Sequence, residues 1–304
     1  MTSFEVIIDD TLYNLTTQGT NKNYILSAVN DFQDGEWWYE KFNDYIVDNI
    51  VLTALSASER TKIPNSSHSQ LKKACRNLRL TTSQNDKGRG SEIAEIMLYA
   101  FMNEHFNALP IVPKIFNKQN PNMYAFGADG VHIVLDKNDF SIWYGEAKFY
   151  EKIDAKQLNT IATSVHNSLK TAKIRKENSI VTDLNELKQV LGTDSRKEEI
   201  LSLLDDKTSI DKLKPHLHIP IMVLYECELT ACQKELTNEY KDELKRIQIE
   251  NSKLYFATQD TLCKDDIFKY SDITFHLIYF PVPNKDKVVD IFASHAEFYR
   301  KTIV

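Results

Sequence analysis

Apolar and polar residues alternate along this chain with two periods, one typical of strands and one typical of helices. Short runs rich in β-branched and aromatic residues predict strands at 4–8, 126–135, 140–150, 218–225, 253–258 and 274–282. Apolar positions three or four residues apart, together with charged stretches, predict helices at 24–30, 36–57, 91–107, 154–176, 183–205, 229–250 and 285–299, and a short basic helix within 62–90. Strands and helices therefore interleave along most of the chain.

This interleaving favours an α/β fold, in which helices flank a mixed central β-sheet and additional helical elements lie towards the two ends of the chain. Polar loop signals between residues 62 and 90 mark a boundary. We therefore expect a helix-rich N-terminal segment over residues 1–84 and a main domain over residues 85–304. The first segment carries aromatic residues that suit core packing or a partner-binding surface: Trp37, Trp38, Tyr39, Phe42 and Tyr45.

The apolar runs 126–135 and 140–150 predict a β-hairpin, because the turn-forming residues 136–139 lie between them. Leu135 pairs with Phe140 whether the loop has two residues or four. The register of the whole hairpin follows from that pair.

Counting outward from the turn places Asp129 directly opposite Glu146. Directly opposed residues have Cβ atoms roughly 5 Å apart, and side chains alternate with period two, so Lys148 projects from the same face as Glu146. Three charged groups should therefore meet at the end of an otherwise apolar face.

Two opposed carboxylates repel each other unless positive charge lies between them. Lys148 could neutralise only one carboxylate, whereas a divalent cation such as Mg²⁺ suits both and takes oxygen ligands at about 2.1 Å. A plainer interpretation makes Asp129-Gly130 a turn and Glu146-x-Lys148 a solvated strand face. The apolar run 131–134 follows Gly130 directly, which argues against a turn at Asp129-Gly130 and favours a metal site.

The hairpin resembles the PD-(D/E)xK nuclease superfamily, which has an acidic residue on one strand and an acidic-x-Lys triplet on the next. More narrowly, GADGVH at 127–132 and WYGEAKFY at 143–150 resemble the nuclease subunit of the Hachiman anti-phage defence system. The resemblance covers the hairpin and the helix before it. Ala128 departs from the pattern, since the superfamily name has a proline before the first acid.

That resemblance implies a PD-(D/E)xK nuclease-like core and Mg²⁺-dependent hydrolysis of DNA phosphodiesters without strong sequence specificity, with Mn²⁺ able to substitute. Asp129, Glu146 and the backbone carbonyl of Ala147 would hold one or two ions. Lys148 would position the attacking water, neutralise charge in the transition state or act as a base. It also implies an effector of an anti-phage complex that works on DNA with a superfamily 2 helicase subunit.

The resemblance further implies an acid on the helix before the hairpin. Glu95, within AEIMLY, resembles the family's helix acid more closely, whereas Glu92 matches the spacing of related resolvases. Both could instead be first-turn acids that interact favourably with the helix dipole. We place Glu95 ahead of Glu92 as a metal ligand acting through water.

Net charge of −6 argues against a protein that binds nucleic acid tightly by itself, since such affinity comes largely from cations neutralising phosphates. Two basic segments could contact a DNA backbone or form solvated helix faces. They comprise Lys72, Lys73, Arg76 and Arg79, and Lys170, Lys173, Arg175 and Lys176. Weak intrinsic affinity would fit a nuclease that a partner delivers.

A second function class is a non-catalytic, nuclease-like interaction subunit that docks and regulates a helicase. Acidic charge and the N-terminal aromatic residues suit that role, but an intact set of Asp129, Glu146 and Lys148 argues against an inactive relic. Hydrolysis of a nucleotide or another phosphoester has less support, because the chain has no Gly-x-x-x-x-Gly-Lys-Ser/Thr loop.

Signals of membrane insertion or secretion are missing from the sequence. No apolar stretch approaches the roughly 20 residues of a membrane span, and the start is polar, so we expect a cytoplasmic protein. The cysteines lack paired zinc-site spacing and are expected to be reduced thiols: Cys75, Cys227, Cys232 and Cys263.

Overall fold

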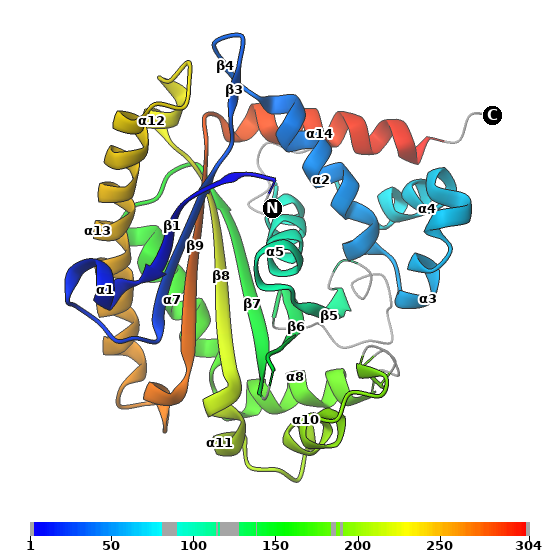
Figure 1. The fold of residues 1–304 in the computed structure, drawn as a ribbon, viewed down its shortest axis with the longest axis vertical. Coiled ribbons are helices and arrows are strands. Elements are labelled where there is room, and N and C mark those ends of the chain that lie inside the picture. The colour runs from blue at the N-terminus through cyan, green and yellow to red at the C-terminus, as the bar shows by residue number, and fades with distance from the viewer. Residues whose placement is uncertain are drawn as a thin grey trace.

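The computed structural model describes residues 3–80, 90–113, 115, 128–137, 139–183, 187–188 and 191–301. Figure 1 shows a central sheet with helices on both of its faces. The strands are β1 (Glu5–Thr11), β2 (Asn23–Val29), β3 (Phe32–Gln33), β4 (Glu36–Trp37), β5 (Leu109–Pro113), β6 (Gly130–Leu135), β7 (Phe140–Tyr150), β8 (Leu217–Glu226) and β9 (Thr274–Val282).

The described helices vary in length from four residues to the 26 residues of α13. They are α1 (Leu12–Thr16), α2 (Tyr39–Ala54), α3 (Ala57–Arg60), α4 (Ile63–Asn77), α5 (Ser91–Phe106), α7 (Ala155–Ser168), α8 (Thr171–Asp183), α10 (Lys197–Leu204), α11 (Ile210–Leu213), α12 (Glu228–Ala231), α13 (Asn238–Cys263) and α14 (Lys285–Arg300). Two 3₁₀ turns, η1 (Lys214–His216) and η2 (Tyr270–Asp272), precede β8 and β9.

The main sheet has seven strands in the order β1-β2-β9-β8-β7-β6-β5. The strands β2, β9, β8 and β7 are parallel to their neighbours within this central group, whereas β1 and the pair β6 and β5 add antiparallel strands at the two edges. A mixed sheet flanked by helices confirms the α/β fold that the interleaved pattern predicts.

Two hydrophobic layers cover the two faces of this sheet. One layer joins β7, β8 and β9 to α2, α5 and α14, with Trp143, Ala147 and Phe280 among its buried members. The other joins the opposite faces of the same strands to α7, α8 and α13, with Tyr144, Ile161 and Phe256 among its members. Trp143 and Tyr144 belong to different layers because consecutive strand residues point to opposite faces.

The helix predicted at 24–30 is wrong, because this segment forms β2. Leu26 and Ala28 enter one hydrophobic layer and Ile25 enters the other. A strand buried on both faces is a continuous apolar run without period-two alternation, which short segments share with buried helices.

The strand predicted at 253–258 is also wrong, because the segment lies inside α13. Thr237 caps the start of this helix through a hydrogen bond from the Tyr240 N–H. Buried residues then recur at helical spacing along it: Gln248, Ser252, Tyr255, Phe256 and Gln259. Tertiary packing of this face overrides the β propensity of the local string.

Several predicted helices start or divide differently from expectation. The helix predicted from residue 36 begins at Tyr39, because Asp34 and Gly35 both have positive φ and turn β3 back onto β4. The helix predicted at 154–176 divides into α7 and α8, where the Ser168 hydroxyl donates to the Val165 carbonyl at 2.7 Å. The charged helix predicted at 229–250 is α12 followed by α13.

Other predicted elements are confirmed, including the first strand, the helix at 91–107, the strands β8 and β9, and the closing helix. The boundary between residues 84 and 85 lies outside the described residues, as do positions 126–127 of the first hairpin strand and residue 138 of its turn. Parts of the predicted helical region 183–205 also lie outside them.

Aromatic residues near the N-terminus pack in the core. Trp37, Phe42 and Tyr45 are 4%, 2% and 7% exposed. The Phe42 ring lies 5.4 Å from the ring of Phe280 on β9. Core packing therefore accounts for these three residues.

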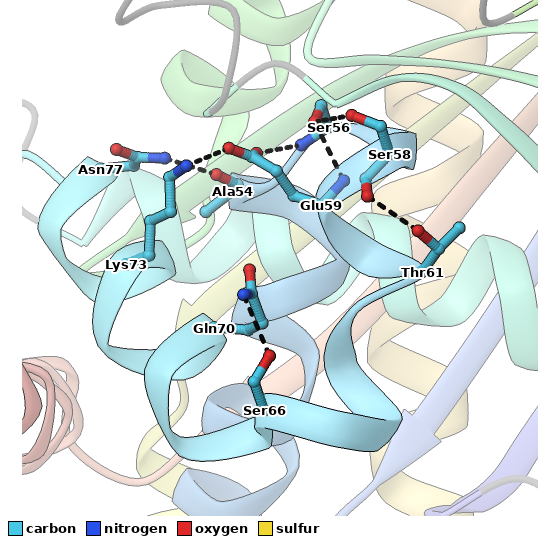
Figure 2. A network of polar contacts seen from close by, with 9 residues as sticks. All are labelled: Ala54, Ser56, Ser58, Glu59, Thr61, Ser66, Gln70, Lys73 and Asn77. Carbon is cyan, nitrogen blue, oxygen red and sulfur yellow. Dashed lines mark hydrogen bonds and ion pairs between the residues drawn. The ribbon is translucent and has the colours of Figure 1, made fainter.

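The turn between α2 and α4 is held by a capping box (Figure 2). The Ser56 N–H donates to Oε2 of Glu59 at 2.9 Å, and the Glu59 N–H donates to the Ser56 hydroxyl at 3.3 Å. Lys73 on α4 pairs with the same glutamate, and Asn77 donates to the Ala54 carbonyl at 2.7 Å. Lys73, a member of the first basic segment, thus has a structural role.

Candidate active site

The β6–β7 hairpin has the register that its turn predicts. Leu135 lies opposite Phe140, and the pairing continues to Gly130 opposite Gly145. Asp129 lies one residue beyond the last pair, and its N–H donates to the Gly145 carbonyl at 2.7 Å, so the ladder ends before the direct Asp129–Glu146 pair that the count predicts. The hairpin therefore delivers the first acid to the end of β6.

The two carboxylates are nearly buried, with Asp129 9% exposed and Glu146 7% exposed. Oδ2 of Asp129 accepts a hydrogen bond from the Ala147 N–H at 2.7 Å. Oε1 of Glu146 accepts one from the Ser164 hydroxyl on α7 at 2.7 Å and also pairs with Nζ of Lys148. Each carboxylate is thus oriented by at least one hydrogen bond.

The Lys148 ammonium has both carboxylates as electrostatic partners. Burial lowers its pKa, but the charges of Glu146 and Asp129 raise it more strongly, so the pKa of Lys148 lies above its ordinary value. This direction favours the charged ammonium at neutral pH. In this arrangement Lys148 supplies positive charge next to the acids.

The backbone carbonyl of Ala147 also points towards the Asp129 carboxylate. The N–H and C=O of one strand residue point to the same edge of the strand. Because the Ala147 N–H points to Asp129, the Ala147 carbonyl lies along the same edge of β7. Two carboxylates and one carbonyl therefore offer oxygen atoms around the end of β6.

Glu95 lies on α5, which packs against the other face of β7. A Cβ atom added at Gly90 would lie 2.9 Å from Phe149, and one added at Gly145 would lie 2.6 Å from Leu98. The helix therefore runs antiparallel to β7, and Glu95 lies between these two contact points, on the face of β7 opposite to Glu146 and Ser164. Its side chain is 6% exposed.

Glu92 holds the backbone that follows α4. Its carboxylate accepts the Arg79 N–H at 2.9 and 3.0 Å and the Leu80 N–H at 3.1 Å. Glu92 is 8% exposed. These bonds give this glutamate a structural task.

A cavity of about 160 Å³ adjoins Glu146 on the α7 side of the sheet. Its walls come from β7, β8, α7 and α8 and from the residues between these helices. The lining residues are Ala128, Tyr144, Gly145, Glu146, Ser164, Asn167, Ser168, Leu169, Lys173, Ile174, Glu177, Leu217 and Ile219. The candidate site therefore opens into a partly apolar space.

A sequence model of the HamA family matches residues 2–296. The chain belongs to the HamA family. This membership places it among Hachiman-type anti-phage proteins. No curated protein matches the chain.

The donor set of this HamA-family chain suits a hard cation. Carboxylate and carbonyl oxygens are the ligands that Mg²⁺ takes, and Mg²⁺ usually keeps several waters and needs only one or two protein carboxylates. Among the described residues, no group of three or more His, Cys, Asp or Glu side chains is placed to hold a metal ion. A site built on Asp129 and Glu146 would therefore depend on the Ala147 carbonyl and on water.

Ser164 is a site residue that the sequence analysis of this HamA-family chain missed. It lies beside the buried stripe of α7, formed by Leu158, Ile161, Ala162 and Val165. A helical wheel marks Ser164 as a polar residue at the edge of that stripe. The partner of its hydroxyl comes from a different element, so spacing along the chain carries no signal for the bond.

The structure of the HamA-family chain also places the second basic segment and the cysteines. Lys173 of the second basic segment lines the cavity beside Glu146. All four cysteines are free thiols, and Cys75 and Cys263 are buried. No helix within the described ranges combines the length and apolar character that a bilayer crossing requires.

Gly145 is expected to be intolerant of a side chain, because a Cβ atom there would overlap the buried Leu98. Gly145→Ala should lower the free energy of unfolding by about 1–3 kcal/mol, the usual cost of overpacking. Urea denaturation would measure it. In a Leu98→Val background, which shortens the overlapping side chain, the cost of Gly145→Ala should shrink. An equal cost in both backgrounds would contradict the steric explanation.

Proposed function

We propose that this chain is a Mg²⁺-dependent deoxyribonuclease that hydrolyses DNA phosphodiester bonds without strong sequence specificity. It would act as the effector of a Hachiman-type complex with a superfamily 2 helicase subunit. The observation that supports this activity is the buried pair Asp129 and Glu146, brought beside Lys148 by the hairpin register. Membership of the HamA family supports the anti-phage setting.

The metal would be held by Asp129, Glu146 and the Ala147 carbonyl, with Glu95 acting through water and Mn²⁺ able to substitute for Mg²⁺. When bound, it would polarise the phosphate and acidify a water molecule. Asp129 is already oriented by the Ala147 N–H, and Glu146 by the Ser164 hydroxyl. Such fixed ligands reduce the reorganisation needed when substrate binds.

Lys148 would neutralise the negative charge that develops on the phosphate oxygens. Its side chain is 30% exposed, whereas the Glu146 side chain is 10% exposed, so the ammonium is the more accessible of the pair. A charged donor in a partly buried site stabilises a developing oxyanion more strongly than it would in water.

The helicase partner would supply the affinity for DNA that the acidic chain lacks. Its net charge is −6 because 43 Asp and Glu residues outnumber 37 Lys and Arg residues, and an acidic balance opposes binding to phosphates. Some residues of the two basic segments already make contacts within the chain, since Lys73 pairs with Glu59 and Arg175 donates to the Asp206 carbonyl. Delivery by a partner would raise the local concentration of DNA at the site.

The test is direct cleavage by purified full-length chain, alone and with its helicase partner, on plasmid and oligonucleotide DNA in Mg²⁺, Mn²⁺ or EDTA. Cleavage in either metal that EDTA abolishes supports the proposal. A chain that binds the helicase normally yet cuts no DNA under any of these conditions would instead be a regulatory subunit.

Ser164→Ala is expected to lower the cleavage rate about 10–100-fold, the usual effect of losing a group that orients a metal ligand, because it removes one of the two contacts that hold Oε1 of Glu146. The Mg²⁺ concentration for half-maximal rate should rise, and Ser164→Thr should restore it. Thr163→Ala, which removes an exposed hydroxyl from the same helix, serves as the control. An unchanged Mg²⁺ dependence in Ser164→Ala would show that the serine does not position Glu146.

A further inference from the structure

The cavity beside Glu146 has an apolar interior and a polar mouth. Four of its lining side chains are at most 3% exposed and wholly aliphatic: Leu169, Ile174, Leu217 and Ile219. The mouth carries exposed Asn167 and Lys173. An apolar body with a few polar groups at its entrance is the usual construction of a small-molecule site.

Its dimensions suit a single flat ring. At about 160 Å³, the space is close to the apolar cavity of about 150 Å³ that admits benzene in another protein. Tyr144, 6% exposed, and the buried Glu177 also line the wall. The cavity thus combines aliphatic and aromatic surface with a carboxylate that can accept hydrogen bonds from amino groups.

The entrance has the charge that a phosphate backbone requires. Lys173 lies in the first turn of α8, where the helix dipole also favours anions, and Lys170 immediately precedes this helix. Glu146 belongs both to the cavity wall and to the carboxylate pair. A nucleotide whose phosphate lay at the carboxylates would therefore have the cavity within reach of its base.

We propose that this cavity receives one unpaired nucleobase of the DNA strand that is cut, and that the chain therefore prefers single-stranded or locally unpaired DNA. The inference rests on the proposed nuclease function and extends it to the form of the substrate. A paired base cannot enter, because its partner would have to enter with it. Duplex DNA must first lose a base from its stack, and that cost is smallest where the strand is already unpaired.

The first test compares cleavage of one labelled sequence as a single strand, as a perfect duplex and as a duplex with an unpaired bubble, using the full-length chain in Mg²⁺. Cleavage of the single strand and within the bubble should exceed that of the duplex about tenfold or more. Equal rates on all three would overturn the base-binding inference and leave the nuclease intact. Absence of metal-dependent cleavage on every substrate, both by the chain alone and by its complex with the helicase partner, would instead overturn the proposed function.

The second test locates the base, using a single-stranded oligonucleotide that carries 2-aminopurine and the Lys148→Ala variant to prevent cutting. Entry of the base into the cavity should raise its fluorescence, because 2-aminopurine is quenched while stacked on its neighbours. Adding Ile174→Phe, which fills the cavity, should abolish the rise. A folded Ile174→Phe chain that gives the same rise would overturn the inference.

Should Ile174→Phe fail to fold, a variant at the mouth keeps the inference testable. Lys173 is exposed, so Lys173→Ala should fold, and it should weaken binding of the single-stranded oligonucleotide severalfold. Lys176→Ala removes an exposed lysine of the same helix that does not line the cavity, and it should have the smaller effect. Equal losses of oligonucleotide binding in both variants would show that the DNA strand does not pass the mouth of the cavity.

Discussion

Asp129→Asn, Glu146→Gln and Lys148→Ala are each expected to reduce Mg²⁺-dependent cleavage of plasmid DNA on the order of 10²–10³-fold or more. The two amides keep the shape of the acids but remove the negative charge that a metal ion needs. Lys148→Ala removes the ammonium that lies beside both carboxylates. Initial rates of conversion of supercoiled plasmid to nicked and linear forms would measure the losses.

Asp136→Asn is the matched control, because it alters an exposed acid at the turn of the same hairpin. It should cleave at the rate of the unaltered chain. Thermal unfolding and helicase binding should be retained in the site variants, so that loss of cleavage reports chemistry. Full cleavage activity in Asp129→Asn would show that the Asp129 carboxylate has no role in catalysis.

Glu92→Ala is expected to cost about 3 kcal/mol of unfolding free energy, because the backbone N–H groups of Arg79 and Leu80 would lose their acceptors. Glu92→Gln keeps one oxygen acceptor and should cost less. Urea denaturation with a fitted midpoint and slope would measure both variants. A change below about 0.5 kcal/mol in Glu92→Ala, the range of ordinary surface substitutions, would contradict an anchoring role.

Substitutions of Glu95 and Glu92 are expected to affect the cleavage rate differently. Glu95→Gln is expected to lower the cleavage rate about 10–100-fold, the usual effect of a group that acts on a metal through water. Glu92→Gln, assayed well below its unfolding temperature, should leave the rate unchanged. The reverse result would assign the helix acid to Glu92.

The geometry of the β6–β7 hairpin was predictable because it is local. A single turn at residues 136–139 sets the register, and period-two alternation then places every side chain of β6 and β7 on a known face. Counting outward from the Leu135–Phe140 pair is enough to pair Gly130 with Gly145. Helix α5 was also predicted with nearly correct bounds, although the structure buries every residue from Glu92 to Met102 rather than one face.

Predictions failed where a segment's neighbours outweighed its own pattern. The β2 segment has no alternation because helices cover both faces of the sheet, and the aromatic string in α13 is helical because its buried residues follow a helical stripe. Local propensities differ by only about 1 kcal/mol or less per residue, which is less than the burial of one large side chain.

The amino-acid order was sufficient to predict the α/β class and the β6–β7 hairpin with its pairing from Leu135–Phe140 to Gly130–Gly145, since these depend on short-range periodicity. The bond from Ser164 to Glu146, the anchoring of the backbone by Glu92 and the cavity between α7, α8 and the sheet depend on folding. Each joins groups from separate elements, and their relative positions follow from packing of the whole core rather than from spacing along the chain.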